Sequence, residues 1–245
     1  MNAPVAKVNL KQLQTHCSYC SLRELCLPMG LSEEEVEHLD RLVSNRRQLK
    51  RGDCLYRNGD AFASIYAVRS GFFKSRVTSD DGRDQVTGFH MPGEIIGMDG
   101  IGTERHTLDT VALEDSEVCV IPFARLEEIS HEVKNLQRQF HKVMSRELVR
   151  DQGVMMLLGT MRAEERVSAF LINLSQRFLA RGWSPSDFHL RMTREEIGSY
   201  LGLKLETVSR LFSRFQEEGL VSVQQKHIRI LDVPGLKKIV GQEPC

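Results

Sequence analysis

The sequence predicts an α+β chain with three parts: a small antiparallel β-barrel or roll, one long helix, and a helix-turn-helix unit with a wing. Three patterns carry this prediction. Short apolar segments alternate with glycine turns from residue 46 to residue 121, residues 125–161 contain no proline, and two short amphipathic helices meet at Gly202. The resulting units are a cysteine-rich arm (1–30), the roll (31–124), the long helix (125–161) and the C-terminal unit (162–245).

The composition excludes several other classes of protein. The 245 residues include 33 basic and 33 acidic side chains, so bulk positive charge does not hold this chain on nucleic acid. Hydrophobic residues make up 41% and charged residues 27%, which is typical of a folded soluble protein. The longest apolar stretches are far too short to cross a bilayer, and the N-terminus lacks the apolar stretch of a signal peptide. We therefore expect a cytoplasmic protein with no membrane partner.

The cysteines are distributed unevenly. Three of the six lie within ten residues of the arm and the others are scattered; in chain order they are Cys17, Cys20, Cys26, Cys54, Cys119 and Cys245. A disulfide framework is not expected in a compartment that keeps thiols reduced. Structural zinc and iron–sulfur clusters both take four ligands, and a cluster tolerates one distant partner. The sequence leaves Cys54, Cys119 and His16 open as the fourth ligand.

The roll is predicted from a helix and a series of short strands. Residues 31–42 form an amphipathic helix with Ser32 as its N-cap. The predicted strands are Cys54–Tyr56, Ser64–Val68, Phe72–Val77, Val86–His90 and Val118–Ile121, and they are separated by turns at Gly52, Gly59, Gly71, Gly82 and Gly93. Strands this short, at this spacing, are typical of a small antiparallel barrel or roll.

Residues 125–161 predict one continuous helix. Its apolar stripe recurs at spacings near a heptad and consists of Met144, Leu148, Met155 and Leu158. Such a stripe favours pairing with a second copy of the same helix. Asp151 falls on the stripe, so two Asp151 carboxylates would approach each other in a parallel homodimer and weaken it. The alternative is that Asp151 faces solvent, or pairs with Arg150 or Lys142 of the other copy.

The C-terminal unit begins with a helix over Ala163–Arg181 and a loop at Gly182–Asp187. Thr193 and Glu196 then form a capping box that opens a short helix, which ends at Gly202. A second helix starts near Leu205 and buries an apolar face made of Val208, Leu211, Phe212 and Phe215. This is the geometry of a helix-turn-helix, in which the second helix enters the major groove of double-stranded DNA.

The polar face of the second helix carries the side chains that would read DNA. It consists of Lys204, Glu206, Thr207, Ser209, Arg210, Ser213 and Arg214. Arginine can bond guanine O6 and N7, and glutamate can accept from cytosine N4. The strand-like segments 220–223 and 227–231 would form a wing, with Lys226 and Arg229 near phosphates. The alternative is ordinary helix packing in which Glu206 and Arg210 form a solvated pair.

Four segments resemble the FNR branch of the CRP/FNR family of transcription regulators. They are FASIYAVRSGFFK and VTGFHMPGEIIG in the roll, and AEERVSAFLINLSQRF and MTREEIGSYLGLKLETVSRLFSRFQEEGL in the C-terminal unit. The resemblance covers essentially the whole chain. It implies a cyclic-nucleotide-binding-like β-roll, a dimerisation helix and a winged helix-turn-helix, in an oxygen-sensing activator of anaerobic genes.

The resemblance also implies residue roles. The family's reading motif E-x-x-S-R stands here at residues 206–210, so Glu206 and Arg210 would read the G·C pair of a TTGAT-like half-site, with Ser209 on a neighbouring thymine. Two half-sites in a palindrome would match a symmetric dimer. The family's V-C-x-I-P-F segment stands at residues 118–123, which makes Cys119 the fourth ligand. With Cys17, Cys20 and Cys26 it would hold an oxygen-labile [4Fe–4S] cluster. The alternative is a zinc- or thiol-based redox regulator of the same fold.

The resemblance also bears on two further partners, a cyclic nucleotide and RNA polymerase. Nucleotide-binding members cradle the phosphate with a Gly-Glu turn followed closely by an Arg-Ser pair. Here Gly93 and Glu94 are present but Arg105 is followed by His106, so we expect no cyclic nucleotide. Activators also contact RNA polymerase, and the charged turn at residues 79–84 lies where this family has one such surface.

The charges divide unequally between the two halves. Residues 1–161 hold 20 basic and 23 acidic side chains, and residues 162–245 hold 13 and 10, so the net charges are −3 and +3. Because each copy's positive excess is small, strong DNA binding is expected to need two copies. The sequence contains no G-x-S-x-G elbow, P-loop or H-E-x-x-H motif, and we expect no enzyme.

Overall fold

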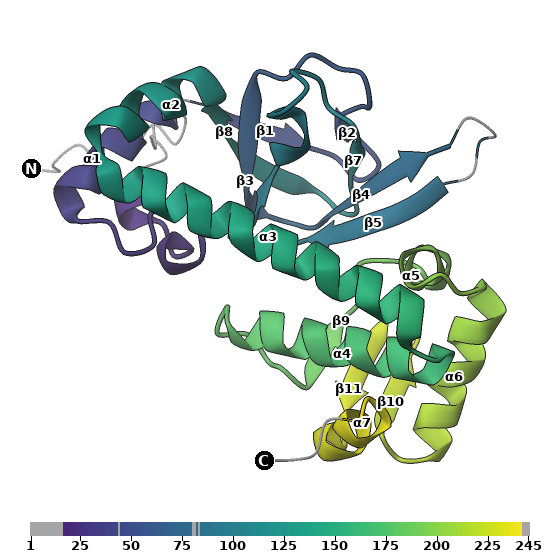
Figure 1. Ribbon diagram of the computed structural model, residues 1–245. Coiled ribbons are helices and arrows are strands. Elements are labelled where there is room, and N and C mark those ends of the chain that lie inside the picture. Colours follow the sequence, from purple (N-terminus) through teal and green to yellow (C-terminus); the bar gives the residue numbers. More distant parts are fainter. Residues whose placement is uncertain (1–16, 44, 80–81, 83, 242–245) are drawn as a thin grey trace, which may run out of the picture.

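The computed structural model describes residues 17–43, 45–79, 82 and 84–241 (Figure 1). The roll consists of two four-stranded sheets whose paired strands are all antiparallel. The first has the order β1 (Asn45–Leu49), β8 (Ser116–Pro122), β3 (Ser64–Ser70) and β6 (Ile95–Ile96). The second has the order β2 (Cys54–Tyr56), β7 (Asp109–Ala112), β4 (Phe73–Thr78) and β5 (Asp84–His90). Apolar side chains from both sheets, including Leu49, Val68, Phe73 and Val118, pack in one cluster.

All five predicted strands are present, and β1, β6 and β7 are additional. The segment of β1 reads NRRQL and has no alternation of apolar and polar residues. Leu49 is its only apolar residue and its only buried one. Its polar side chains are accommodated at the edge of the sheet, where Arg46 pairs with Glu117 of β8 at 3.6 Å. An edge strand can therefore form without the alternating pattern that predicts half-buried strands.

Helix α1 (Glu33–Leu42) begins where the sequence predicted. The Ser32 hydroxyl accepts from the Glu35 amide, and the Glu35 carboxylate accepts from the Ser32 amide at 2.8 Å. The arm before it forms two short 3-10 turns, η2 (Cys17–Tyr19) and η3 (Arg23–Leu25). The Asp40 carboxylate of α1 accepts from the Cys17 amide and the Ser18 hydroxyl, which ties the arm to this helix.

The prediction of one helix over residues 125–161 is wrong. The chain forms α2 (Phe123–Glu132) and α3 (Lys134–Thr160), separated at Val133. No proline or glycine causes the break. Leu126 of α2 and Leu136 of α3 are buried with Val133 in one cluster that also contains side chains of α1. Tertiary packing therefore bends a segment whose local sequence would continue as a helix.

The C-terminal unit contains α4 (Ala163–Leu179), α5 (Arg194–Leu201), α6 (Leu205–Glu217) and α7 (Val233–Ile239). The wing strands β10 (Val221–Gln224) and β11 (His227–Ile230) form as predicted. A third strand, β9 (Asp187–His189), pairs with β11. The predicted loop at residues 182–187 thus ends in a strand, because its Asp187 lies opposite Arg229 in the sheet and bonds it.

The C-terminal unit contacts the roll through α5 and the β4–β5 hairpin (Figure 1). Lys74 Nζ bonds Glu196 at 2.6 Å, and the Ser199 hydroxyl accepts from the Val86 amide at 2.8 Å. Phe89 and Tyr200 add a ring contact with centroids 5.2 Å apart. Glu196 is therefore both the capping residue of α5 and a link between the two units. Within the described ranges, no helix is long and apolar enough to cross a membrane.

Candidate functional sites: reading helix and cysteine pocket

Two glycines allow the tight turn of the helix-turn-helix. Gly202 ends α5 in the left-handed conformation, with φ of 62°, where a side chain is unfavourable. A Cβ on Gly198 would lie 2.6 Å from the Leu203 carbonyl oxygen, so only glycine allows the turn to approach α5. Thr193 and Glu196 form the predicted capping box. The buried residues of α6 are the four that the sequence predicted, Val208, Leu211, Phe212 and Phe215.

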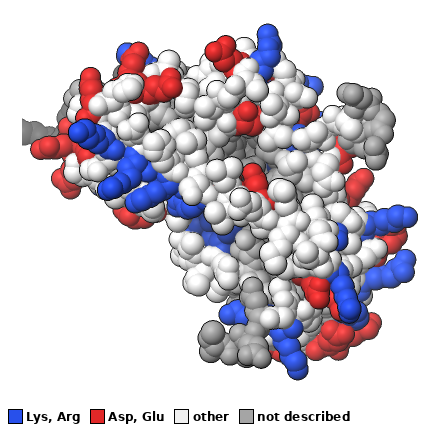
Figure 2. All heavy atoms as spheres, in the orientation of Figure 1, with Lys and Arg blue, Asp and Glu red and all other residues white. Residues whose placement is uncertain are grey.

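The opposite face of α6 is open to solvent. Lys204, Glu206 and Arg210 are exposed, and Thr207 and Ser209 are partly exposed. Figure 2 shows Lys and Arg side chains projecting at the lower right, where α6 lies in Figure 1. Across the part of the chain that the structure describes, neither the Glu206 nor the Arg210 side chain has a hydrogen bond or ion pair. The solvated Glu206–Arg210 pair, which was the alternative, is not formed. The Glu206 carboxylate and the Arg210 guanidinium are therefore both available to a ligand.

Four other predicted contact residues have their side chains bonded within the chain. Arg214 pairs with Glu164 of α4, and its Nε lies 3.2 Å from Glu218. The Ser213 hydroxyl donates to the Ser209 carbonyl oxygen at 3.2 Å. In the wing, Arg229 Nε lies 3.0 Å from Asp187 and Lys226 Nζ donates to the Arg191 carbonyl oxygen at 3.2 Å. Contact of any of these groups with DNA requires exchange of these bonds.

The four predicted ligand cysteines line one pocket, here called the cysteine pocket. Cys17, Cys20 and Cys26 come from the arm, and Cys119 comes from the middle of β8. The rest of the lining is mostly apolar and includes Leu27, Leu39, Val43, Ala67 and Ile121, with Arg23 and Arg69 as its charged members. Cys54 lies in the other sheet, where its thiol donates to the Tyr56 carbonyl oxygen at 3.0 Å. His16 and Cys245 lie outside the described residues.

Burial affects three thiols of the cysteine pocket, those of Cys17, Cys26 and Cys119. Burial raises the pKa of Cys17 far above its usual range, and neighbouring Cys26 and Asp40 raise it further. Burial raises the pKa of Cys26 to about 12 against a hydrogen bond from the Leu27 amide, and burial also raises the pKa of Cys119. Thiols in such surroundings stay protonated at neutral pH, so metal binding there would release protons.

The ligand atoms of the cysteine pocket are those that an iron–sulfur cluster requires. It brings four thiols together in apolar surroundings, which is the ligand set such clusters take. Among the residues whose placement is described, no three His, Cys, Asp or Glu side chains converge as the ligands of one metal ion. A single zinc ion needs all its ligands at about 2.0–2.3 Å, whereas the thiolates of a cluster bind separate iron atoms.

The predicted stripe of α3 is uncovered at its centre. Leu148 is 64% exposed and Met155 is 70% exposed, and Asp151 between them is exposed as well. Met144 and Leu158 are partly buried. Exposed apolar side chains in a row on one helix are typical of a protein–protein contact. The partner of this stripe, and the role of Asp151, stay predictions.

The Gly93-Glu94 turn has contacts that the sequence did not reveal. The Glu94 carboxylate is bonded by Arg177 of α4 and by Arg181, which follows that helix, both at 2.7 Å. Arg105 is exposed and donates to the Gly59 carbonyl oxygen at 2.7 Å. No local pattern could have indicated the arginines, because they lie more than 80 positions after Glu94. Of the charged turn 79–84, residues 80, 81 and 83 lie outside the described residues.

The fold and the open reading helix define a DNA-binding transcription regulator, and comparisons identify its family. Residues 46–132 match a cyclic nucleotide-binding domain and residues 165–239 match a Crp-like helix-turn-helix domain. The chain is 49% identical over 239 residues to the transcriptional regulatory protein btr of Bordetella pertussis, across 98% of this chain and 99% of that one. It belongs to the CRP/FNR family of transcription regulators.

Other relatives agree with this assignment. The transcriptional activator protein anr of Pseudomonas aeruginosa is 49% identical over 228 residues, 93% of each chain. The fumarate and nitrate reduction regulatory protein of Escherichia coli is 43% identical over 226 residues, 92% of this chain and 90% of that one. The solved structure of FixK2 from Bradyrhizobium japonicum has a TM-score of 0.74 and 27% identity, and the match covers 82% of this chain and 98% of that one. The predicted family and fold class are confirmed.

Proposed function

We propose that this regulator senses oxygen through a [4Fe–4S] cluster held by Cys17, Cys20, Cys26 and Cys119, and controls anaerobic gene expression. The observation that carries the proposal is the cysteine pocket, where three thiols of the arm meet a fourth from β8. The cluster, when bound, supplies an oxygen-labile centre. The protein would contribute the four thiolates and an apolar lining that limits access of water.

The proposed output is binding to palindromic TTGAT-like half-sites by a homodimer. Glu206 and Arg210 are supported as base-reading residues because both are exposed and have no partner in the described chain. The exposed stripe of α3 supports the homodimer. The names of two relatives, a transcriptional activator and a fumarate and nitrate reduction regulator, support activation of anaerobic genes. Activation would also require RNA polymerase as a partner, for which residues 79–84 remain the candidate surface.

The deciding experiment is metal analysis of protein purified without oxygen. We expect about four irons and four sulfides per chain, little zinc, and a brown colour that bleaches in air. The same sample should bind a TTGAT palindrome before exposure to air and lose this binding afterwards. Stoichiometric zinc, or no metal with DNA binding that responds to thiol oxidation, would instead establish the zinc- or thiol-based regulator.

We expect this regulator not to respond to cyclic nucleotides. The Glu94 carboxylate is held by Arg177 and Arg181, and Arg105 is bonded to a backbone carbonyl in the roll. Isothermal titration of the protein with cAMP should therefore give no heat of binding. Tight binding of cAMP would contradict this expectation. We expect the protein to act in the cytoplasm.

A further inference from the structure

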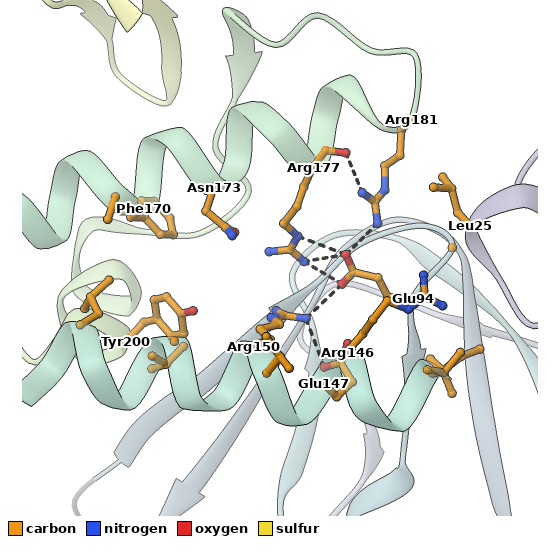
Figure 3. Close-up of a pocket in the computed structure, with 18 of the residues that line it drawn as sticks. Leu25, Glu94, Arg146, Glu147, Arg150, Phe170, Asn173, Arg177, Arg181 and Tyr200 are labelled. Carbon is orange, nitrogen blue, oxygen red and sulfur yellow. Dashed lines mark hydrogen bonds and ion pairs between the residues drawn. The ribbon is translucent and has the colours of Figure 1, made fainter. Parts of the chain in front are cut away.

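A cavity lies where three parts of the molecule meet, between α3, α4 and the turn that joins β5 to β6 (Figure 3). Leu25 of the arm also lines it, so the arm, the roll and the C-terminal unit all reach this place. Glu94 points into the centre of the view, toward Arg177 of α4, Arg181 just after α4, and Arg150 of α3. These four side chains are here called the Glu94 clamp.

The carboxylate of Glu94 has several charge-assisted bonds. Oε1 accepts from Arg181 at 2.7 Å and Oε2 accepts from Arg177 at 2.7 Å, while Arg177 also reaches Oε1 at 2.9 Å through the same nitrogen. Arg150 Nη1 lies 3.5 Å from Oε2. Burial alone would raise the pKa of Glu94, but Arg177, Arg150 and Arg181 lower it to about 2. The carboxylate therefore stays charged at every physiological pH.

The same arginines hold the backbone just before the turn and within it. Arg150 and Arg177 both donate to the Phe89 carbonyl oxygen, at 2.5 and 2.7 Å. Arg181 Nε donates to the Pro92 carbonyl oxygen at 2.7 Å. One segment of the roll is thus bonded to α3 and to α4 at once. Planar guanidinium groups make such multiple bonds directional, so the contact fixes orientation as well as distance.

The arm is in close contact with this turn. Gly93 has φ of 89°, and a Cβ added to it would lie 2.7 Å from the Leu25 Cβ. The backbone of the turn and Leu25 are therefore as close as a glycine permits. Leu25 precedes Cys26, a member of the cysteine pocket. A displacement of Cys26 would move Leu25 away from the turn that carries Glu94.

We infer that the Glu94 clamp sets the orientation of the DNA-binding unit relative to α3, and that the arm supports the clamp through the contact of Leu25 with Gly93. Because α3 carries the exposed stripe, the clamp would fix the spacing of the two reading helices in a dimer, and half-site spacing is a strict geometric requirement. Glu94 is a positioning residue here, since it does not contact DNA. The part played by the arm rests on the proposed function, whereas the clamp does not.

The first test compares Glu94→Gln with Glu128→Gln, the same change at an exposed ion pair of α2. Amide hydrogen exchange is measured without DNA over residues 177–182, and dimerisation and DNA affinity are measured on the same samples. We expect faster exchange only in Glu94→Gln, an unchanged dimer, and DNA binding weaker by about tenfold, because a smaller fraction of dimers has the competent spacing. Exchange and affinity equal to those of the control would overturn the inference.

Two further variants keep this test informative if Glu94→Gln folds poorly. Glu94→Asp retains the charge and should recover most of the DNA affinity. Arg181→Lys retains the positive charge but cannot reach Glu94 and the Pro92 carbonyl oxygen together, so it should behave like Glu94→Gln. A fully active Arg181→Lys variant would contradict the clamp.

The support from the arm is tested by a double-mutant cycle. Leu25→Ala and Glu94→Gln should have less than additive effects on exchange over residues 177–182, because both act on one contact. Met29→Ala, another partly buried residue of the arm, is the control. Fully additive effects would refute the arm–clamp link. Iron content of the same samples tests the cluster separately, so failure of the proposed function and failure of the clamp give different results.

Discussion

The reading helix and the cysteine pocket are built in opposite ways. Every predicted side chain of the reading face lies on or next to α6, between residues 204 and 214, and caps and glycines of the same segment hold the helix in place. The cysteine pocket draws on the arm, α1, β3 and β8, and its fourth cysteine lies 93 positions after the third. Local interactions form the first site, and only tertiary packing forms the second.

This difference has a consequence for function. Removing one side chain from an exposed helix face subtracts one contact and leaves the helix intact. A four-ligand site depends on all its members, because a cluster with a missing thiolate is incomplete. The two regions should therefore respond to substitution in different ways, gradually at α6 and in an all-or-none manner at the cysteine pocket.

The largest effect is expected from Cys119→Ser. A serine hydroxyl is not a soft thiolate ligand, so anaerobically purified protein should contain almost no iron and should lose its oxygen-dependent DNA binding. Cys54→Ser is the matched control, because Cys54 lies in the other sheet and outside the cysteine pocket. Iron and sulfide analysis decides between them. Equal iron in both variants would remove the basis for an all-or-none site.

A graded effect is expected from Arg210→Ala. Loss of a bidentate contact to guanine costs about 1–3 kcal/mol and relaxes the preference for that base pair. Arg214→Ala should cost less, because Arg214 already pairs with Glu164 and Glu218. Fluorescence anisotropy with a TTGAT palindrome and with a copy altered at the G·C pair measures both effects. A larger loss of DNA affinity in Arg214→Ala than in Arg210→Ala, or an unchanged base preference in Arg210→Ala, would contradict this expectation.

Acid should affect the roll before it affects the exposed reading face. Burial, together with the nearby Arg150 guanidinium, lowers the pKa of His90 to about 3, and its Nε2 lies 2.9 Å from the Ser75 hydroxyl. Folded His90 stays neutral below pH 6.5 while the unfolded chain takes up a proton. Stability is therefore lost as the pH falls from about 6.5, by at most about 1.4 kcal/mol per pH unit.

Urea unfolding at pH 7 and pH 5 tests this expectation. His90→Gln should lose less stability between the two pH values than the parent protein. His141→Gln, at an exposed position of α3, should behave like the parent. Identical losses in all three proteins would mean that His90 does not carry the pH dependence.

Asp151→Ala should strengthen the homodimer by a smaller amount. Removing two like charges that approach in a largely solvated seam is worth about 1 kcal/mol, or about a fivefold lower dissociation constant. Sedimentation in air compares this variant with Glu132→Ala, at an exposed position of α2. If Asp151→Ala stays monomeric like the parent protein, Asp151 does not oppose pairing.

The smallest effect is expected from Lys226→Ala in the wing. A phosphate contact carries no sequence information, so binding should weaken by a similar factor on every sequence. The slope of log affinity against log salt should fall by about one per chain. Titration of DNA binding with salt measures this slope. A change in base preference would instead place Lys226 among the reading residues.

Sequence patterns predicted the parts of the fold that short-range interactions control. The N-cap at Ser32, the capping box at Thr193 and the apolar period of α6 were all predicted correctly, because each depends on residues three or four positions apart. The strand β1 was missed because an edge strand of polar residues has no alternating pattern. The break at Val133 was missed because packing against α1, and not a local breaker, causes it.

The sequence by itself determined the reading helix, the number of cysteines available as ligands and the family of the chain. The family resemblance implied Cys119 as the fourth ligand, but only the tertiary structure shows that it lines one pocket with Cys17, Cys20 and Cys26. Only the tertiary structure shows that Glu94 is bonded to Arg177 of α4 and to Arg181 just after it. The physical reason is sequence separation. A contact between distant residues depends on how whole elements pack, and helical or strand periodicity contains no information about which distant side chains meet.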